Sequence, residues 1–96
     1  MDILINEVSY SGDYCINLTF NNGRQGVANL KETIFHDKRP VFSTLKDESN
    51  FKNFKVAHSA VVWSDEIDLA SEYLFYLAFK DEPDLQAQFK QWGYLI

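Results

Sequence analysis

The side chains best suited to catalysis are one cysteine and two histidines. Cys15 is the only thiol among the 96 residues, so no disulfide can form within the chain. A catalytic thiol needs a base beside it, and the available bases are His36 and His58. Cys15 lies in a run that alternates apolar and polar residues, where a small side chain fits either face of a strand. We therefore expect a structural cysteine, and histidines that serve as ordinary polar residues.

The sequence segments most similar to a metal-binding pattern are rich in carboxylates. Such a site usually combines two to four His, Cys or carboxylate ligands at short spacing. His36-Asp37 and the group Asp65, Glu66 and Asp68 come closest to this pattern. The acidic group lacks the glycine and the distant glutamate of a calcium loop, which favours a polar turn before a helix. We expect no metal ligand here.

The glycines and serines form no nucleotide-binding or acyl-transfer motif. Gly12, Gly23, Gly26 and Gly93 are too dispersed for a phosphate-binding loop. No serine stands in a G-x-S-x-G elbow. We therefore expect no catalytic or cofactor-binding residue, no cofactor and no enzymatic activity.

The charge of the chain is negative and unevenly spread. The net charge is −5, but the segment 64–85 alone sums to −6, because seven acids there face one base, Lys80. Nucleic-acid affinity rests mostly on Lys and Arg, so direct nucleic-acid binding is not expected. The acidic segment is either a solvated face or a docking patch for a basic partner. The acids are Asp65, Glu66, Asp68, Glu72, Asp81, Glu82 and Asp84.

Hydropathy places the chain in aqueous solution. Hydrophobic residues make up 46% of the chain and aromatic residues 16%, which is enough for the packed core of one small domain. No apolar run approaches 18 residues, and no basic start precedes an apolar stretch. We expect no membrane contact and a cytoplasmic location.

The first third of the chain predicts a pair of strands and a hairpin. Residues 3–10 are rich in strand formers, and 14–20 alternate apolar with polar residues, the period of a half-buried strand. Asn22-Gly23 then favours a two-residue type I′ turn. With that loop, Leu18 faces Val27, which places Val27 in the core.

The middle of the chain is less regular. Pro40 is suited to the first turn of a short helix that carries Val41, Phe42 and Leu45. Residues 49–54 form either a helical turn or a loop. Residues 55–63 are strand material, and a bend at His58-Ser59 is left open.

The last third predicts two helices. Asp68 is suited to cap a helix that begins near residues 69–71, with Glu72 in its first turn. Residues 73–79 are apolar almost all round, so this helix must be covered on more than one side. A second helix opens at Pro83-Asp84 and ends at Gly93. It presents Leu85, Phe89 and Trp92 on one face.

These elements together predict an α+β fold in one domain. An antiparallel sheet of hairpins packs against a C-terminal helix, and a short extra helix follows. We expect residues 1–79 to form the domain and residues 80–96 a helical extension. The apolar end Tyr94-Leu95-Ile96 either folds back onto the domain or is buried in an interface.

Several segments, in this order and spacing over about residues 1–76, resemble the bacterial family called domain of unknown function 2442. The resemblance implies a small α+β domain and no established reaction. Members occur alone or joined to a helix-turn-helix domain, and some are encoded beside another small protein in arrangements suggestive of toxin–antitoxin pairs. The matching segments are Leu18-Thr19-Phe20, Asn22-Gly23, Val27 to Leu30, Phe42, Leu45-Lys46-Asp47, Phe51, Phe54-Lys55-Val56, Val61-Val62-Trp63, Asp68-Leu69 and Glu72-Tyr73-Leu74.

The chain departs from the family pattern at three places. Ser64-Asp65-Glu66 stands where members often have Pro and Gly, Asn29-Leu30 stands where Asp-Leu is common, and the turn before Val61 looks shortened. The tail from Lys80 to Ile96 is too short for a helix-turn-helix domain, so a transcription-factor role is less expected than in fused members.

The sequence favours a non-catalytic protein-interaction module, the antitoxin-like half of a small complex, whose partner is another small protein. One alternative is a homo-oligomeric structural or small-ligand-binding domain, in which the partner is a second copy. Another is an accessory domain in transcription regulation without its own DNA-binding motif. Trp and Tyr are enriched at interface hot spots. The candidate partner-binding residues are Tyr76, Phe79, Phe89, Trp92 and Tyr94.

Overall fold

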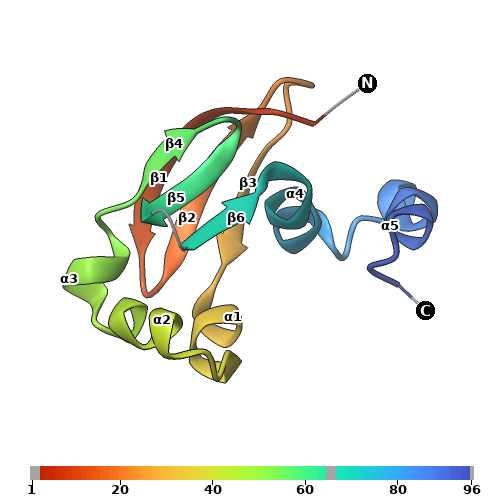
Figure 1. The fold of residues 1–96 in the computed structure, drawn as a ribbon. Helices are drawn as coiled ribbons and strands as arrows, with labels where there is room; N and C mark the ends of the chain where they lie inside the picture. The colour runs from red at the N-terminus through yellow and green to blue at the C-terminus, as the bar shows by residue number, and fades with distance from the viewer. Residues whose placement is uncertain (1–2, 65–66, 96) are drawn as a thin grey trace.

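The chain folds into two small antiparallel sheets flanked by short helices (Figure 1). The computed structural model describes residues 3–64 and 67–95. The first sheet has the order β1-β2-β3 and the second β4-β5-β6, which confirms the expected α+β class. The strands are β1 (Ile5–Gly12), β2 (Cys15–Phe20), β3 (Gln25–Asn29), β4 (Lys55–Ala57), β5 (Ala60–Ser64) and β6 (Ile67–Ala70).

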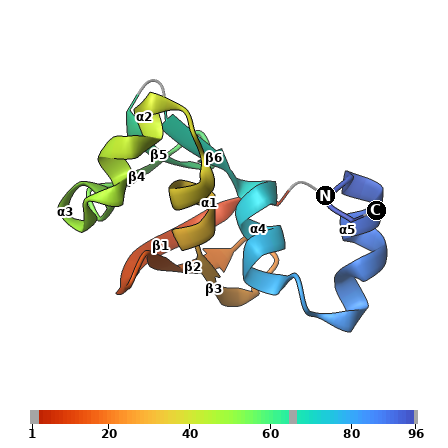
Figure 2. The same ribbon diagram turned by 90° about the horizontal axis from the view of Figure 1, so that it is seen from below.

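Three short helices join the two sheets, and two more follow them (Figure 2). Between β3 and β4 lie α1 (Lys31–His36), α2 (Pro40–Ser43), a 3₁₀ turn (Thr44–Lys46) and α3 (Glu48–Phe51). After β6 come α4 (Ser71–Phe79), a 3₁₀ turn (Pro83–Leu85) and α5 (Gln86–Trp92). Both views place α2 and α3 at one end of the molecule and α5 at the other.

The predicted alternation of β2 sets the inner face of the first sheet. Ile16, Leu18 and Phe20 are at most 2% exposed, while Asn17 between them is exposed. The inner side chains pack on α4, where the rings of Phe20 and Phe75 meet edge to face at 5.0 Å. Such ring pairs contribute about 0.5–1.5 kcal/mol beyond the area they bury.

The hairpin at Asn22-Gly23 forms, but its predicted loop and register are wrong. Gly23 has a φ of +87°, whereas Asn22 does not have the positive φ that a type I′ turn requires. Gly23 N–H donates to Phe20 O and Phe20 N–H donates to Arg24 O, each at 3.0 Å. These bonds describe a three-residue loop, a type I turn closed by a left-handed glycine.

The extra loop residue reverses the two faces of β3. Leu18 pairs with Gly26 instead of Val27, and Val27 pairs with Asn17. A shift of one residue moves every side chain of a strand to the opposite face. Val27 is therefore 49% exposed and outside the core, while Ala28 is fully buried.

The open question at His58-Ser59 is answered by a tight turn. Both residues have positive φ, +52° and +60°, and Ala57 pairs with Ala60 across them. This is the geometry of a two-residue type I′ hairpin. The sequence analysis expected a type I′ turn at Asn22-Gly23 instead. It did not identify the one at residues 58–59, because no glycine or asparagine stands there.

The middle segment contains more helix than its pattern indicated. Residues 31–36 form α1, which buries Ile34. Pro40 begins α2 as expected, and Phe42 and Leu45 are buried. The helical alternative for residues 49–54 is correct in part, because α3 spans Glu48–Phe51 and its N-terminus is capped by Asp47, whose carboxylate accepts the Ser49 N–H at 2.9 Å.

Asp68 does not cap the following helix. It lies within β6 with its side chain exposed, and α4 begins at Ser71 without a side-chain cap. The strand continues because β6 pairs with β5 through Ala70. Ser71 makes the polar contact at this end, since its hydroxyl donates to Ile3 O at 2.6 Å.

The apolar helix α4 is covered on several sides, as its composition predicted. It packs on β3 and β6, and α5 covers another side through rings such as Phe75 against Phe89 at 6.1 Å. Gly93 ends α5 with a φ of +90°, as expected, and Tyr94 N–H bonds back to Phe89 O at 3.0 Å. The boundary drawn at residue 79 stays a prediction, and Ile96 lies outside the described residues.

β3 and α4 approach each other closely at Gly26. A Cβ built on it would lie 2.7 Å from Phe79 Cε1, and that ring is held by Phe20 and Phe75. We predict that Gly26→Val lowers the free energy of unfolding by about 1–3 kcal/mol through overpacking. Gln25→Val, on the exposed face of the same strand, serves as the control and should change it by about 0.5 kcal/mol or less. Equal denaturation midpoints for the two variants would contradict the observed register.

The left-handed conformation of Ser59 lowers the stability of the folded state. An L-residue in the left-handed region costs about 1–2 kcal/mol, and glycine avoids most of it. We predict that Ser59→Gly raises the free energy of unfolding by about 0.5–1 kcal/mol, measured by urea denaturation. Ser9→Gly, in the exposed part of β1, should lower it instead. If both variants lose stability equally, residue 59 does not have a left-handed conformation.

Candidate functional site

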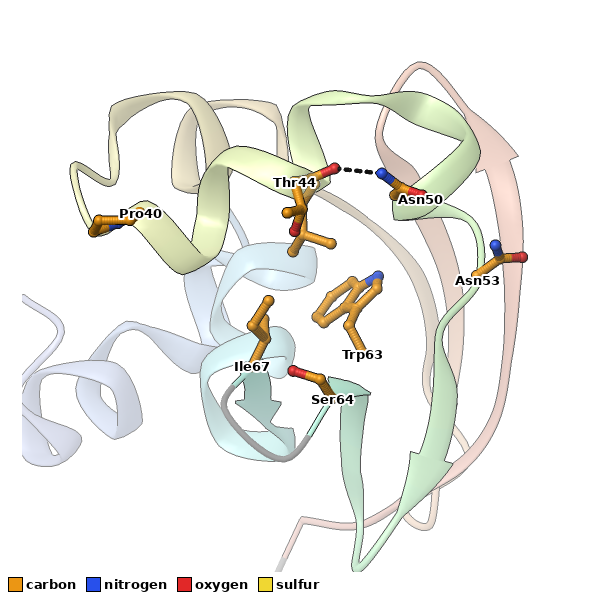
Figure 3. A pocket seen from close by; sticks show the side chains of 8 residues that line it. Pro40, Thr44, Asn50, Asn53, Trp63, Ser64 and Ile67 are labelled. Atoms are coloured by element: carbon orange, nitrogen blue, oxygen red, sulfur yellow. Dashed lines mark hydrogen bonds between the residues drawn. The ribbon is translucent and has the colours of Figure 1, made fainter.

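A surface hollow of about 680 Å³ lies between the α2–α3 segment and the second sheet (Figure 3). Its centre is Trp63, whose ring packs against Phe51 at 5.6 Å and Phe54 at 6.2 Å. The lining residues are Pro40, Thr44, Leu45, Asn50, Asn53, Trp63, Ser64 and Ile67.

Polar side chains of this hollow, which we call the Trp63 hollow, donate hydrogen bonds to backbone carbonyls. The indole N–H of Trp63 donates to Phe51 O at 2.6 Å, and the Asn50 amide donates to Thr44 O at 3.1 Å (Figure 3). The described lining residues include no charged side chain. Among the described residues, the contacts of the hollow are structural and fix α3 against β5.

A second hollow is more polar and lies between α1, the end of β3 and α4. This α1–α4 groove has a volume of about 610 Å³. The Thr33 hydroxyl and the Tyr73 hydroxyl are 2.8 Å apart across it, and Lys31 forms an ion pair with Asp13 at 3.2 Å. Its lining residues are Asn29, Lys31, Glu32, Thr33, Tyr73, Tyr76, Leu77 and Lys80.

The third feature is a group of half-buried rings on α4, α5 and the residues after them. We call Tyr76, Trp92 and Tyr94 the aromatic surface. Tyr76 and Tyr94 stack at 4.8 Å with an interplanar angle of 18°, and Trp92 meets Tyr94 edge to face at 6.3 Å. Because Gly93 turns the chain back at the end of α5, Tyr94 is brought onto α4.

The environment of Tyr94 is partly desolvated and negatively charged. Burial raises the pKa of the Tyr94 hydroxyl above its ordinary value, and the nearby Glu72 carboxylate raises it further. The phenol therefore stays protonated at neutral pH. Its role in the aromatic surface is that of a ring and a neutral hydroxyl.

The structure divides the five predicted partner-binding residues into two groups. Phe89 is fully buried and Phe79 is 7% exposed, so both belong to the core of this chain. Tyr76, Trp92 and Tyr94 are half-buried and reach the surface. The prediction that this region binds a partner therefore depends on those three residues.

The candidate catalytic side chains lie apart from one another along the chain. Cys15 begins β2 and its thiol lies 3.7 Å from Asp13 O, His36 ends α1, and His58 occupies the turn between β4 and β5. Within residues 3–64 and 67–95, no group of three or more His, Cys, Asp or Glu side chains is arranged to hold a metal ion. Asp65 and Glu66 lie outside the described residues.

Sequence reasoning missed the α1–α4 groove. Its central contact joins Thr33 and Tyr73, which are 40 residues apart. No local motif marks such a pair, and the segment that carries Thr33 was not predicted to be helical. The aromatic surface was found because Tyr and Trp near an apolar chain end are an unusual composition.

No helix in the described parts of the chain has the length and apolar character needed to span a membrane.

Comparison with known proteins gives one structural likeness and a family. A search of curated proteins finds no significant match. The fold resembles the crystal structure of NE0471 from Nitrosomonas europaea ATCC 19718, which is described as a candidate DNA-binding protein, with a TM-score of 0.74 and 14% identity. The likeness covers 99% of this chain and 63% of that one, so this chain spans less than two thirds of its length. At this identity the likeness concerns the fold alone.

The family model described as "Protein of unknown function (DUF2442)" matches residues 5–80, which include both sheets and all of α4. The segments that resembled this family in the sequence lie in β2, β3 and the turn between them, the α2–α3 region, β4, β5, β6 and α4. By this match the chain belongs to the DUF2442 family of proteins of unknown function.

Proposed function

We propose that this chain is a non-catalytic protein-interaction domain that binds a second small protein through its aromatic surface. The observation that carries the proposal is the set of three half-buried rings Tyr76, Trp92 and Tyr94. Tyr and Trp supply large contact areas at low conformational cost and dominate interface hot spots. The antitoxin-like half of a two-protein complex is the role that this arrangement fits best.

The aromatic surface is held in place before any partner binds. Tyr76 is fixed by Phe89, which it meets edge to face at 5.2 Å, and Tyr94 is fixed by stacking on Tyr76. Trp92 packs against Phe75 at 6.1 Å. Rings that are already ordered lose little entropy on association, so more of their contact energy contributes to affinity.

The carboxylate beside this surface favours a basic partner. Glu72 is exposed on α4, and its negative charge acts on the Tyr94 hydroxyl. Asp81 and Glu82 are exposed after the other end of the helix, beside Val27 and Asn29. Asp84 already forms an ion pair with Arg24. A partner that presents Lys or Arg would find the Glu72 carboxylate and ring faces here.

A second candidate function is that of an accessory domain in transcription regulation. The observation in its favour is the fold likeness to the Nitrosomonas protein, in which the matching region makes up 63% of a longer chain described as a candidate DNA-binding protein. In such a role this domain would supply contacts to other proteins, while a separate segment contacted DNA. The aromatic surface would serve either role.

We predict that Tyr94→Ser weakens binding to the partner by about 10- to 30-fold, because the variant removes a stacked ring from the centre of the contact. The tagged full-length protein is first purified from its native host, and a stoichiometric companion is identified by mass spectrometry. The companion is then produced alone, and its affinity for the wild type and for the variant is measured by calorimetry.

Val56→Ser is the matched control, because Val56 is also exposed, at 41%, but lies in β4, away from the aromatic surface. This variant should bind as the wild type does. The proposal fails if no companion is present at stoichiometric amount at native abundance, or if Tyr94→Ser and the wild type bind it equally well.

A further inference from the structure

The outer edge of β3 carries backbone groups that point away from its sheet. β3 is the last strand of the order β1-β2-β3 and lies next to α4 (Figures 1 and 2). Phe20 N–H donates to Arg24 O, and Leu30 N–H donates to Tyr14 O. In an antiparallel ladder the bonded pairs alternate, so Gly26 and Ala28 bond to β2. The N–H and C=O groups of Gln25, Val27 and Asn29 therefore face outward.

Other sheet edges carry features that prevent pairing with another chain. β1 has an irregular register between Ile5 and Glu7, and a charge at Glu7. β4 has three residues and begins with Lys55. β6 carries Asp68, and the β5–β6 ladder is irregular between Val62 and Ser64. Charges, bulges and short length are the usual protections of an exposed edge.

The described edge of β3 has none of these protections. Its five residues, Gln25-Gly-Val-Ala-Asn29, contain no charge and no proline, and their register with β2 is continuous. At its centre Val27 is 49% exposed, a large apolar side chain on an uncharged edge. An edge of this kind favours the addition of another strand.

The space beside β3 is open to an extended segment. A groove of about 470 Å³ runs between Val27 and Asn29 on one side and residues 77–82 at the end of α4 on the other. The charged groups that line it, Lys80, Asp81 and Glu82, sum to only −1. At physiological ionic strength such a charge is screened within about 8 Å, so it does not oppose an approaching strand strongly.

We propose that two copies of this chain pair through β3, antiparallel and with Val27 on the two-fold axis, to form one continuous six-stranded sheet. This register places Gln25 of each copy opposite Asn29 of the other, and Val27 opposite Val27. The edge is self-complementary, because every facing pair is uncharged and each outward N–H meets an outward C=O. The contact does not involve the aromatic surface, so the two proposals can fail independently.

The expected dimer depends on protein concentration. A five-residue strand pair is smaller than the roughly 1,200–2,000 Å² of a stable interface, so the association is reversible. Sedimentation equilibrium of the full-length protein over about three decades of concentration should show the mass rising from 11.2 kDa towards twice that value. A wild-type mass that stays at the monomer value throughout overturns the proposal.

Val27→Lys tests the edge directly. The variant places two like charges opposite each other on the two-fold axis, and we expect it to stay monomeric at every concentration. Ser9→Lys, an equal change on the exposed face of β1, should dimerise as the wild type does. If Val27→Lys dimerises with the wild-type constant, or if Tyr94→Ser abolishes the dimer while Val27→Lys does not, the interface is elsewhere and the proposal is wrong.

Two further experiments distinguish a loss of pairing at the β3 edge from a general loss of structure: the Val27→Pro variant and amide hydrogen exchange. Proline at residue 27 removes an outward N–H and leaves the bonds from β3 to β2 intact. It should keep the monomer fold, measured by circular dichroism, and still lose the dimer. In the wild type, exchange of the Val27 amide should slow by at least tenfold at high concentration, whereas that of Ser9 should not change. Equal exchange of Val27 at low and high concentration would overturn the proposal.

Discussion

The contact between Gly26 and Phe79 is the constraint on which much of this fold depends. The Phe79 ring lies where a side chain at residue 26 would begin, and Phe20 and Phe75 hold the ring there. Because interiors are close-packed, this approach sets the distance between α4 and the first sheet. It also explains why a glycine occurs inside β3, a strand that otherwise gains from larger side chains.

The position of α4 in turn determines where the surface features lie. One side of the helix packs on β3, another carries Tyr73 towards Thr33 in the α1–α4 groove, and a third receives α5. Tyr76 belongs to both the groove and the aromatic surface. A helix that was apolar almost all round was therefore needed, since each side has its own neighbour. A change in the packing of Phe75 would therefore shift α4, and with it both the α1–α4 groove and the aromatic surface.

The sequence predicted the elements whose signals are local. The alternation of Ile16, Leu18 and Phe20 and the glycine after α5 needed no knowledge of the rest of the fold. The register of β3 could not be predicted, because Asn22-Gly23 fits a two-residue or a three-residue loop, and the choice between them reverses the strand. The tight packing of Gly26 against α4 favours the register observed, and that contact lies 53 residues away along the chain. The contact of Thr33 in the α1–α4 groove was missed for the same reason, because its partner Tyr73 lies 40 residues away along the chain.

Two surfaces on one small domain have a consequence for binding. The edge of β3 and the aromatic surface both border α4, yet the edge uses backbone groups and the aromatic surface uses side chains of residues 76–94. A two-fold dimer through β3 would carry two copies of the aromatic surface on one particle. A partner that is itself dimeric could then bind both, and the second contact would form at the effective concentration set by the first. A modest affinity at each aromatic surface would then be enough for a stable complex, which suits contacts built from only three half-buried rings.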